Sequence, residues 1–213
     1  MNRFKIVFAI LMLSTLLMMS VSAQPTARLQ VIHNAADPAA EMVDVYLNGA
    51  LLLDDFAFRS ATPFINAPAA TPLQIGIAPA NSASVSDTLT SFSVTLADGG
   101  TYVAIANGVL APGSYKSNPD GKNIQFSLFP AANIRETGTG SDVDFVVFHG
   151  ASDAPAVDVI ARGVATLVDD AAYGDFTGYI SVPPASYTLD VTPANDNNTV
   201  VASFQADLSG LGG

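Results

Sequence analysis

The feature that most constrains the fold is a pattern that occurs twice along the chain. Residues 28–38 match residues 144–155, so that His33 corresponds to His149 and Asp37 to Asp153. Further matches follow in the same order with a drift of only a few residues: Val43-Asp44-Val45 with Val157-Asp158-Val159, Gly49 with Gly163, Asp54-Asp55 with Asp169-Asp170, Pro79 with Pro193, and Phe92 with Phe204. Such a duplication predicts two copies of one structural unit.

Each copy has the pattern of short strands. Residues 42–47 alternate, with Val43 and Val45 on one face and Asp44 on the other, and Asn48-Gly49 is a strong hairpin signal that leads into residues 50–53. Further strands are expected at 28–33, 62–66, 73–78, 89–96, 101–107 and 124–129. Charged residues make up only 13% of the chain, while 16 glycines and 13 prolines supply turns. We therefore predict an all-β protein of two tandem antiparallel β-sandwich domains, Ig-like or transthyretin-like.

The first 23 residues have the composition of a secretory signal helix. Arg3 and Lys5 precede an apolar run at 6–19, and small residues at 20–23 form a cleavage site after Ala23. An uncleaved anchor is the alternative, but the run is shorter than the roughly 20 residues of a spanning helix. We expect a signal peptide at 1–23, a first sandwich at 24–130, a linker at 131–142 and a second sandwich at 143–213.

The second copy lacks counterparts of the last strands of the first. Either the second sandwich is truncated, which we expect, or it has an unpaired edge that invites pairing with another chain. Within the first copy, residues 111–122 are polar and rich in Gly, Pro and Ser, and they predict a mobile hairpin tip.

Composition excludes several classes of function. The chain has no cysteine, which excludes disulfides, thiolate metal sites and a cysteine nucleophile. Its formal net charge is −11 with no basic patch, so we expect no nucleic-acid partner. It also lacks a G-x-S-x-G elbow, a P-loop and a G-x-G-x-x-G motif. We expect a protein that is not an enzyme.

The sequence resembles the DUF4397 family, a domain of unknown function. The resemblance lies in His33-Asn-Ala-Ala-Asp37-Pro38, in the apolar-Asp-apolar strand with its Asn48-Gly49 hairpin, and in Phe64, Pro68 and the strand that ends at Pro79. Ala36 departs from the family pattern, where proline is common. The resemblance covers both copies and implies secreted bacterial or archaeal proteins with tandem sandwich modules. It implies no established activity.

The sharpest candidate site is the repeated set of histidine and aspartate. His33, Asp37 and Asp44, and likewise His149, Asp153 and Asp158, could bind a divalent metal or act as an acid–base pair. The structural alternative, which we favour, is that each histidine bonds to the following turn and that Asp37 and Asp153 form Asx-turns.

Two further groups are weaker candidates. Asp54-Asp55 and Asp169-Asp170, with Asp142 and Asp144, could chelate calcium, although no D-x-D-x-D-G loop is present. The aromatic residues could stack on sugars, but their strand spacing favours core packing; they are Tyr46, Phe58, Phe64, Tyr102, Tyr115, Tyr173, Tyr179 and Tyr187. Of these, Tyr115 is the best surface candidate.

From the sequence we expect an exported surface, adhesion or spacer module without a resident cofactor. It would be secreted, on the bacterial cell surface or in the periplasm, without membrane insertion after cleavage. Its partner would be a protein or glycan bound at loops such as 34–41 and 111–122. The alternative is a carbohydrate- or calcium-binding module appended to a larger secreted enzyme.

Overall fold

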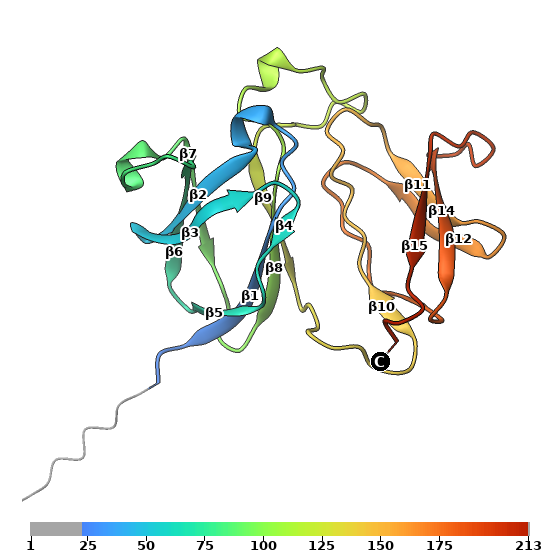
Figure 1. Ribbon diagram of the computed structural model, residues 1–213, viewed down its shortest axis with the longest axis horizontal. Coiled ribbons are helices and arrows are strands. Elements are labelled where there is room, and N and C mark those ends of the chain that lie inside the picture. The colour runs from blue at the N-terminus through green and yellow to red at the C-terminus, as the bar shows by residue number, and fades with distance from the viewer. Residues whose placement is uncertain (1–22, 213) are drawn as a thin grey trace, which may run out of the picture.

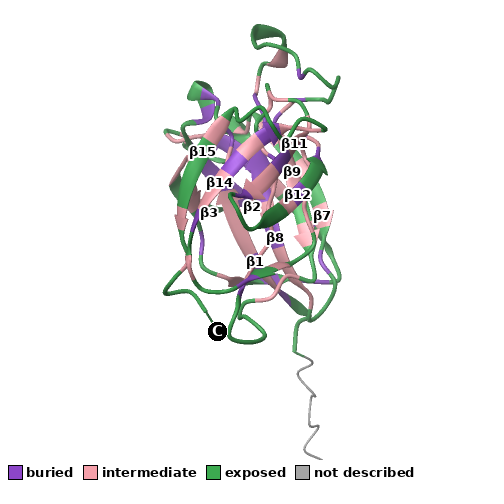
Figure 2. Ribbon diagram, turned by 90° about the vertical axis from the view of Figure 1, so that its right-hand side faces the viewer, coloured by how far each residue is buried: buried purple, intermediate pink, exposed green. Residues whose placement is uncertain are grey.

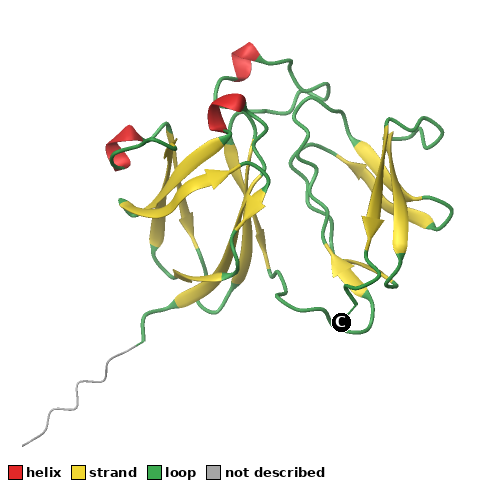
Figure 3. Ribbon diagram, viewed as in Figure 1, coloured by secondary structure: helices red, strands yellow, loops and turns green. Residues whose placement is uncertain are grey.

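The computed structural model describes residues 23–212, and nearly all of their regular structure is strand (Figures 1 and 3). The only helices in this range are three single 3-10 turns, η1 (Pro38–Ala40), η2 (Val85–Asp87) and η3 (Pro112–Ser114). None of the described helices is long and apolar enough to span a membrane. The predicted all-β sandwich class is confirmed. The predicted signal peptide and its cleavage site lie almost wholly outside the described residues.

The first unit is a sandwich of two sheets. One sheet has β1 (Thr26–His33) near its centre, β4 (Ser60–Ala61) and β5 (Ile65–Pro68) on one side, and β8 (Thr101–Asn107) and β9 (Ser127–Ala132) on the other. The second sheet has the order β3 (Ala50–Ala57), β2 (Met42–Leu47), β6 (Pro72–Pro79), β7 (Thr90–Thr95). The β2–β3 hairpin turns at Asn48 and Gly49, whose φ angles of 50° and 85° are the left-handed values that such a turn requires.

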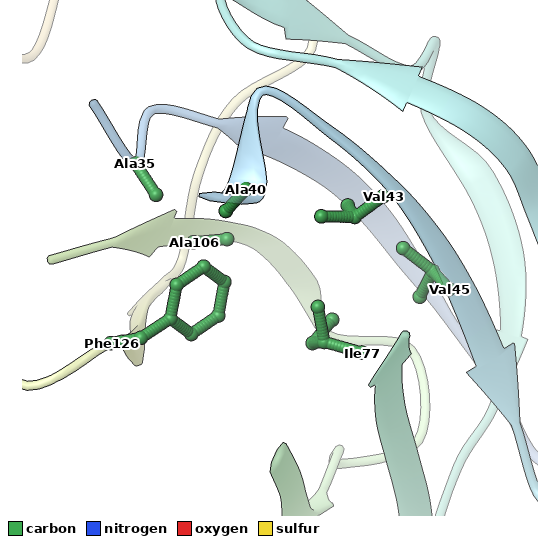
Figure 4. Packing of buried hydrophobic residues seen from close by; sticks show 7 residues of the cluster. All are labelled: Ala35, Ala40, Val43, Val45, Ile77, Ala106 and Phe126. Atoms are coloured by element: carbon green, nitrogen blue, oxygen red, sulfur yellow. The ribbon is translucent and has the colours of Figure 1, made fainter. Parts of the chain in front are cut away.

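The core of the first unit lies between these sheets. Val43, Val45 and Ile77 project from β2 and β6 toward Ala106 of β8 and Phe126, which precedes β9 (Figure 4). A second cluster lies toward the other end and includes Leu29, Ala67, Leu73 and Leu96. Phe126 is 1% exposed, and its ring stacks at 6.3 Å between centroids on that of Phe92. Apolar side chains from both sheets therefore fill the space between them.

The second unit has the same four-stranded sheet but a smaller opposite layer. Its larger sheet has the order β12 (Ala165–Ala171), β11 (Val157–Ala161), β14 (Ser186–Pro193), β15 (Ala202–Asp207). Its register follows that of the first unit, because β2 pairs Val43 with Pro79 and β11 pairs Val157 with Pro193. The opposite layer consists of β10 (Val143–Phe145) and β13 (Ile180–Val182), against five strands in the first unit.

A polar and aromatic junction connects the two units, which lie side by side in Figure 1. Asn107 is 1% exposed, and its Nδ2 donates hydrogen bonds to Gly150 O at 3.0 Å and to the Tyr173 hydroxyl at 3.1 Å. The Phe129 ring packs against those of Phe148 and Tyr173, with centroid separations of 5.2 and 5.9 Å. The junction therefore combines apolar packing with a buried amide.

Three expectations about the first unit need correction. The strands expected at 62–66 and 124–129 lie further along the chain, as β5 and β9. The sandwich is not wholly antiparallel, because β1 and β8 run parallel with Val31 opposite Ala104. Residues 111–122 do not form a free hairpin tip: Asn118 is buried and donates to Ser152 O and Ala154 O of the second unit, at 3.1 and 2.8 Å.

Candidate functional site

The two histidines each close the turn that follows their strand. At the end of β1, His33 Nε2 lies 2.7 Å from Ala40 O, and the Ala35 N–H donates to His33 Nδ1 at 3.4 Å. Since a carbonyl only accepts, Nε2 carries the hydrogen and the ring is the neutral tautomer. Burial lowers the pKa of His33 below its ordinary value and outweighs the opposing effect of the Ala40 carbonyl. The neutral form is therefore the one that the fold uses.

His149 repeats this arrangement in the second unit. Its Nε2 lies 3.0 Å from Pro155 O, and the Ala151 N–H donates to its Nδ1 at 3.3 Å. Both histidines thus have both ring nitrogens engaged with main-chain atoms of the next turn. This is the arrangement of the structural alternative, in which the imidazole stabilises a turn.

Asp37 organises the loops at the junction end of the first unit. Its carboxylate caps η1 by accepting the Ala39 N–H, and it also accepts the Leu110 N–H at 2.7 Å and the Tyr115 hydroxyl at 2.7 Å. Burial raises the pKa of Asp37, but these hydrogen bonds outweigh it and leave the pKa below its ordinary value. The corresponding Asp153 is exposed. The two positions therefore differ in their surroundings although they match in sequence.

Asp44 and Asp158 support an irregularity in the neighbouring strand. Each is 1% exposed. Asp44 Oδ1 accepts the Asp55 N–H at 3.0 Å, and Asp158 Oδ1 accepts the Asp170 N–H at 2.6 Å. Asp55 and Asp170 have left-handed φ angles of 51° and 53°, at places where the register of β3 and β12 slips. The buried aspartates thus satisfy N–H groups that a β-bulge removes from the ladder.

The structure groups these aspartates with the Asp-Asp pairs rather than with the histidines. Within residues 23–212, the sets of three potential ligands whose atoms lie within 4.8 Å of one another are Asp44 with Asp54-Asp55 and Asp158 with Asp169-Asp170. Neither set contains a histidine, Asp37 or Asp153. The predicted histidine–aspartate constellations are therefore not brought together as ligand sets. In the sequence the strand aspartates and the Asp-Asp pairs are separate candidates, and only the fold brings them together.

The remaining candidates for calcium and carbohydrate binding are not part of these two aspartate sets. Asp144 pairs with Arg135 at 3.1 Å and accepts hydrogen bonds from Thr139 and Ser181. The Ser181 and Thr139 hydroxyls lower the pKa of this carboxyl, and Arg135 adds to the effect. Of the aromatic candidates, Tyr46, Tyr173 and Tyr187 are buried, whereas Tyr115 and Tyr179 are the exposed ones.

An apolar groove opens between the two layers of the second unit. We call it the second-unit groove; it has a volume of about 580 Å³ and is lined by Val147, His149, Val157, Val159, Val191 and Phe204, among others. The first unit encloses a cavity of about 60 Å³ at the corresponding place between its sheets. No pattern in the sequence indicates this groove.

Within residues 23–212, the fold and these sites define two linked β-sandwich units whose histidines and buried aspartates hold turns and bulges. The chain belongs to the family described as domain of unknown function (DUF4397), whose model matches residues 22–124 and 144–210. A search of the curated proteins finds no match.

Proposed function

We propose that this chain is an exported, non-enzymatic module of a bacterial cell surface, built from two tandem copies of one sandwich, that serves as a spacer, adhesion or assembly unit. The observation that carries the proposal is the junction. A spacer has to hold its two ends in a fixed relation, and the fully buried Asn107 bonds across to Gly150 and Tyr173 while Asn118 bonds to Ser152 and Ala154.

The placement of the titratable groups supports a non-enzymatic role. General acid–base catalysis needs a side chain that can exchange a proton with a substrate. Both nitrogens of His33 and of His149 lie against main-chain atoms. The carboxylates of Asp37 and Asp44 are likewise occupied by donors of the chain itself. These groups are used to build loops, which are the expected binding surface of such a module.

Export is tested by expressing the chain with its own first 23 residues in a bacterium. We expect the mature protein outside the cytoplasm, with an N-terminus at Gln24, and digestion by protease added to intact cells if it is displayed on the surface. A control with Leu11, Leu13 and Leu16 changed to Asp should remain in the cytoplasm, because the apolar run is interrupted. Retention of the unchanged, full-length protein in the cytoplasm would contradict export.

The spacer role is tested by small-angle X-ray scattering. The protein should scatter as a single body of fixed dimensions. Asn107→Ala combined with Asn118→Ala should broaden its distribution of distances, because the four hydrogen bonds that these two side chains donate to the second unit are lost. Asn198→Ala is the matched control, since this residue is exposed and its main-chain N–H donates to Asp196 within the second unit. Identical scattering from all three proteins would contradict a role for the junction in holding the units together.

The alternative, a calcium- or carbohydrate-binding module, has its own test. Calorimetry with calcium and a glycan array distinguish it from the spacer, because either ligand should give saturable binding. A calcium isotherm that disappears when Asp54 and Asp55 are changed to Asn would favour the alternative. Since Asp44 already accepts hydrogen bonds from Asp55 and Ser82, we expect no such isotherm.

A further inference from the structure

The loop that follows each histidine reaches the junction between the two units. The loop of the first unit is residues 33–41, and the loop of the second unit is residues 149–156; we call them the histidine loops. Each is closed by the two bonds that the ring of its own histidine, His33 or His149, makes to main-chain atoms of the loop. The two loops are therefore the same element of the repeated unit.

The two histidine loops meet at Asn107, the last residue of β8. Asn34, which directly follows His33, donates from Nδ2 to Asn107 Oδ1 at 3.0 Å. Asn107 Nδ2 in turn donates to the carbonyl of Gly150, which directly follows His149. The packing leaves no room for a side chain on Gly150, because its Cβ would lie 2.4 Å from Asn34 Nδ2. The residues that follow the two histidines are thus joined through one buried amide.

The segment 108–122 makes further bonds to both histidine loops. Asp37, in the first loop, accepts two hydrogen bonds from this segment. Asn118 donates to two carbonyls of the second loop, and Asp120 accepts the Ala156 N–H of the same loop at 2.7 Å. The hydrogen bonds of the junction therefore depend on the shape of the histidine loops.

Each histidine loop uses a neutral imidazole. In both rings Nδ1 accepts an N–H of the loop, and Nε2 donates to a carbonyl of the loop. An added proton has to bind to Nδ1, which then becomes a second donor and opposes the N–H that it had accepted. His33 is 0% exposed and His149 is 7% exposed. The loop therefore has to move before water can solvate a charged ring.

Neither imidazole has an anionic partner for the added charge within residues 23–212, since no carboxylate pairs with either ring there. His33 instead lies against the rings of Phe56 and Phe58, with centroid separations of 5.9 and 6.1 Å. Burial lowers the pKa of His33, and the carbonyl that accepts from its Nε2 only partly offsets this effect. A proton on His33 therefore favours a loosened loop over the closed one.

Other ionisable groups lie around the two histidine loops. Around the first they are Asp37, Glu41, Arg59 and Tyr115, and around the second they are Asp120, Asp153, Tyr173 and Asp175. Asp37 and Asp120 are the two of these whose carboxylates accept bonds from or across the junction segment. Burial raises the pKa of Asp37, but its hydrogen-bond donors outweigh burial and leave the pKa below its ordinary value. Asp120 is therefore the group to separate from the histidines in an experiment.

We propose that the junction is acid-sensitive: protonation of His33 and His149 loosens the histidine loops and frees the two units from their fixed arrangement, while both sandwiches stay folded. This response rests on the proposed function, in which the junction fixes the units, and adds regulation to it. Below the ordinary imidazole pKa of about 6.5, each drop of one pH unit raises the ratio of loosened to closed first loops by up to about tenfold, until His33 is protonated in the closed loop as well.

The distance between the units in the purified protein tests this response. The chain has no cysteine, so Ser91→Cys on β7 and Thr166→Cys on β12 place one spin label on an exposed site of each unit. β7 and β12 lie on opposite sides of the molecule in Figure 1, and β12 begins with exposed residues (Figure 2). By double electron–electron resonance we expect a narrow distance distribution at about pH 8 and a broad one at about pH 5, with unchanged circular dichroism.

Variants assign the response to the histidines. His33→Gln combined with His149→Gln should give the same distribution at both pH values, because glutamine does not titrate in this range. Asp120→Asn is the matched control and should keep the response of the original protein, because asparagine still accepts the Ala156 N–H. A response that persists in the glutamine variant, or that disappears in Asp120→Asn, would overturn the proposal.

Nuclear magnetic resonance of the original protein serves as a second measurement if the glutamine variant does not fold. The chain has two histidines, so the signals of both rings can be followed through one pH titration. The pH at which the distance distribution broadens should coincide with the titration of at least one ring. Broadening without a change in either ring, or titration of both rings without broadening, would overturn the proposal.

Three further outcomes separate this proposal from the spacer role. Loss of the folded circular dichroism at the pH of broadening would overturn the acid response, because acid would then unfold a sandwich rather than open the junction. A distribution that is narrow at both pH values would also overturn it, but would leave the spacer role intact. A distribution that is broad at both would contradict the spacer role and this proposal together.

Discussion

Replacing Phe126 by alanine should destabilise the protein more than any replacement on the open side of the second unit. Phe126 is 1% exposed and packs against Val45, Ile77 and Ala106. Truncating a fully buried phenylalanine costs about 3–5 kcal/mol, which includes the cavity left behind. The ring contact with Phe92, worth about 0.5–1.5 kcal/mol, is part of that loss, and we expect a total near 4 kcal/mol. Phe204→Ala should cost less than about 1 kcal/mol, because that ring is 59% exposed.

The assay is urea unfolding followed by circular dichroism and by tyrosine fluorescence, since the chain has no tryptophan. With a slope of about 2 kcal/mol per molar urea, a loss of 4 kcal/mol moves the midpoint of the first unit down by about 2 M. Phe126→Leu, which keeps most of the volume, should lose about 1–1.5 kcal/mol and remains measurable if the alanine variant does not fold.

The reasoning would be refuted by similar losses in Phe126→Ala and Phe204→Ala. It would also be refuted if Phe126→Ala cost less than about 1 kcal/mol, because the first unit would then not depend on the ring that closes it. Either result would remove the contrast between a closed and an open sandwich on which the second-unit groove rests.

Three further predictions concern polar groups. Because burial lowers the pKa of His33, the unfolded chain binds the proton more readily than the folded one. The contribution of His33 to the free energy of unfolding should therefore be fully present above the unfolded pKa of about 6.5 and should be lost as the pH falls below it. His33→Gln should reduce this loss when urea midpoints at about pH 5 and pH 8 are compared. Arg162 donates to Asp190, and together with Ser203 it lowers the pKa of the Asp190 carboxyl to about 2. Arg162→Gln should raise this pKa toward its ordinary value in an NMR titration. An unchanged pKa would disprove the pairing. Asn107→Ala leaves Gly150 O and the Tyr173 hydroxyl without their buried donor, and we expect a loss of about 1–3 kcal/mol in urea unfolding, against no change for Asn198→Ala.

Much of the fold could be predicted because its signals are local. The alternation in residues 42–47 and the Asn48-Gly49 turn specify β2, its hairpin and its inward valines without reference to the rest of the chain. The boundaries of β5 and β9 were less accurate, because short strands next to loops depend on their partners. The parallel pairing of β1 with β8 joins residues 73 positions apart, such as Val31 and Ala104, and no local pattern encodes it.

The candidate site was harder to predict for the same reason. The polar composition of residues 111–122 indicated a loop, but it did not show that Asn118 would be buried against carbonyls of the second unit. The alternation around Asp44 placed its side chain opposite the inward valines. Because β3 bulges at Asp55, the Asp44 carboxylate is instead buried, and it accepts the Asp55 N–H. The signal that could have revealed this is the recurrence of one strand aspartate with one Asp-Asp pair in both copies.

The parallel pairing of β1 with β8 has a consequence for the order in which the protein forms. β1 is the first described strand to be synthesised, yet its β8 partner follows about 70 residues later. At roughly 5–20 residues per second, the edge of β1 that takes β8 stays without its native neighbour for about 4–15 s on the ribosome. Pairings this distant in sequence also slow folding after release, since a long loop must close before the contact stabilises anything. The step most exposed to aggregation is therefore the late docking of the β8–β9 segment, and a folding helper would act on it most effectively by shielding β1 until that segment emerges.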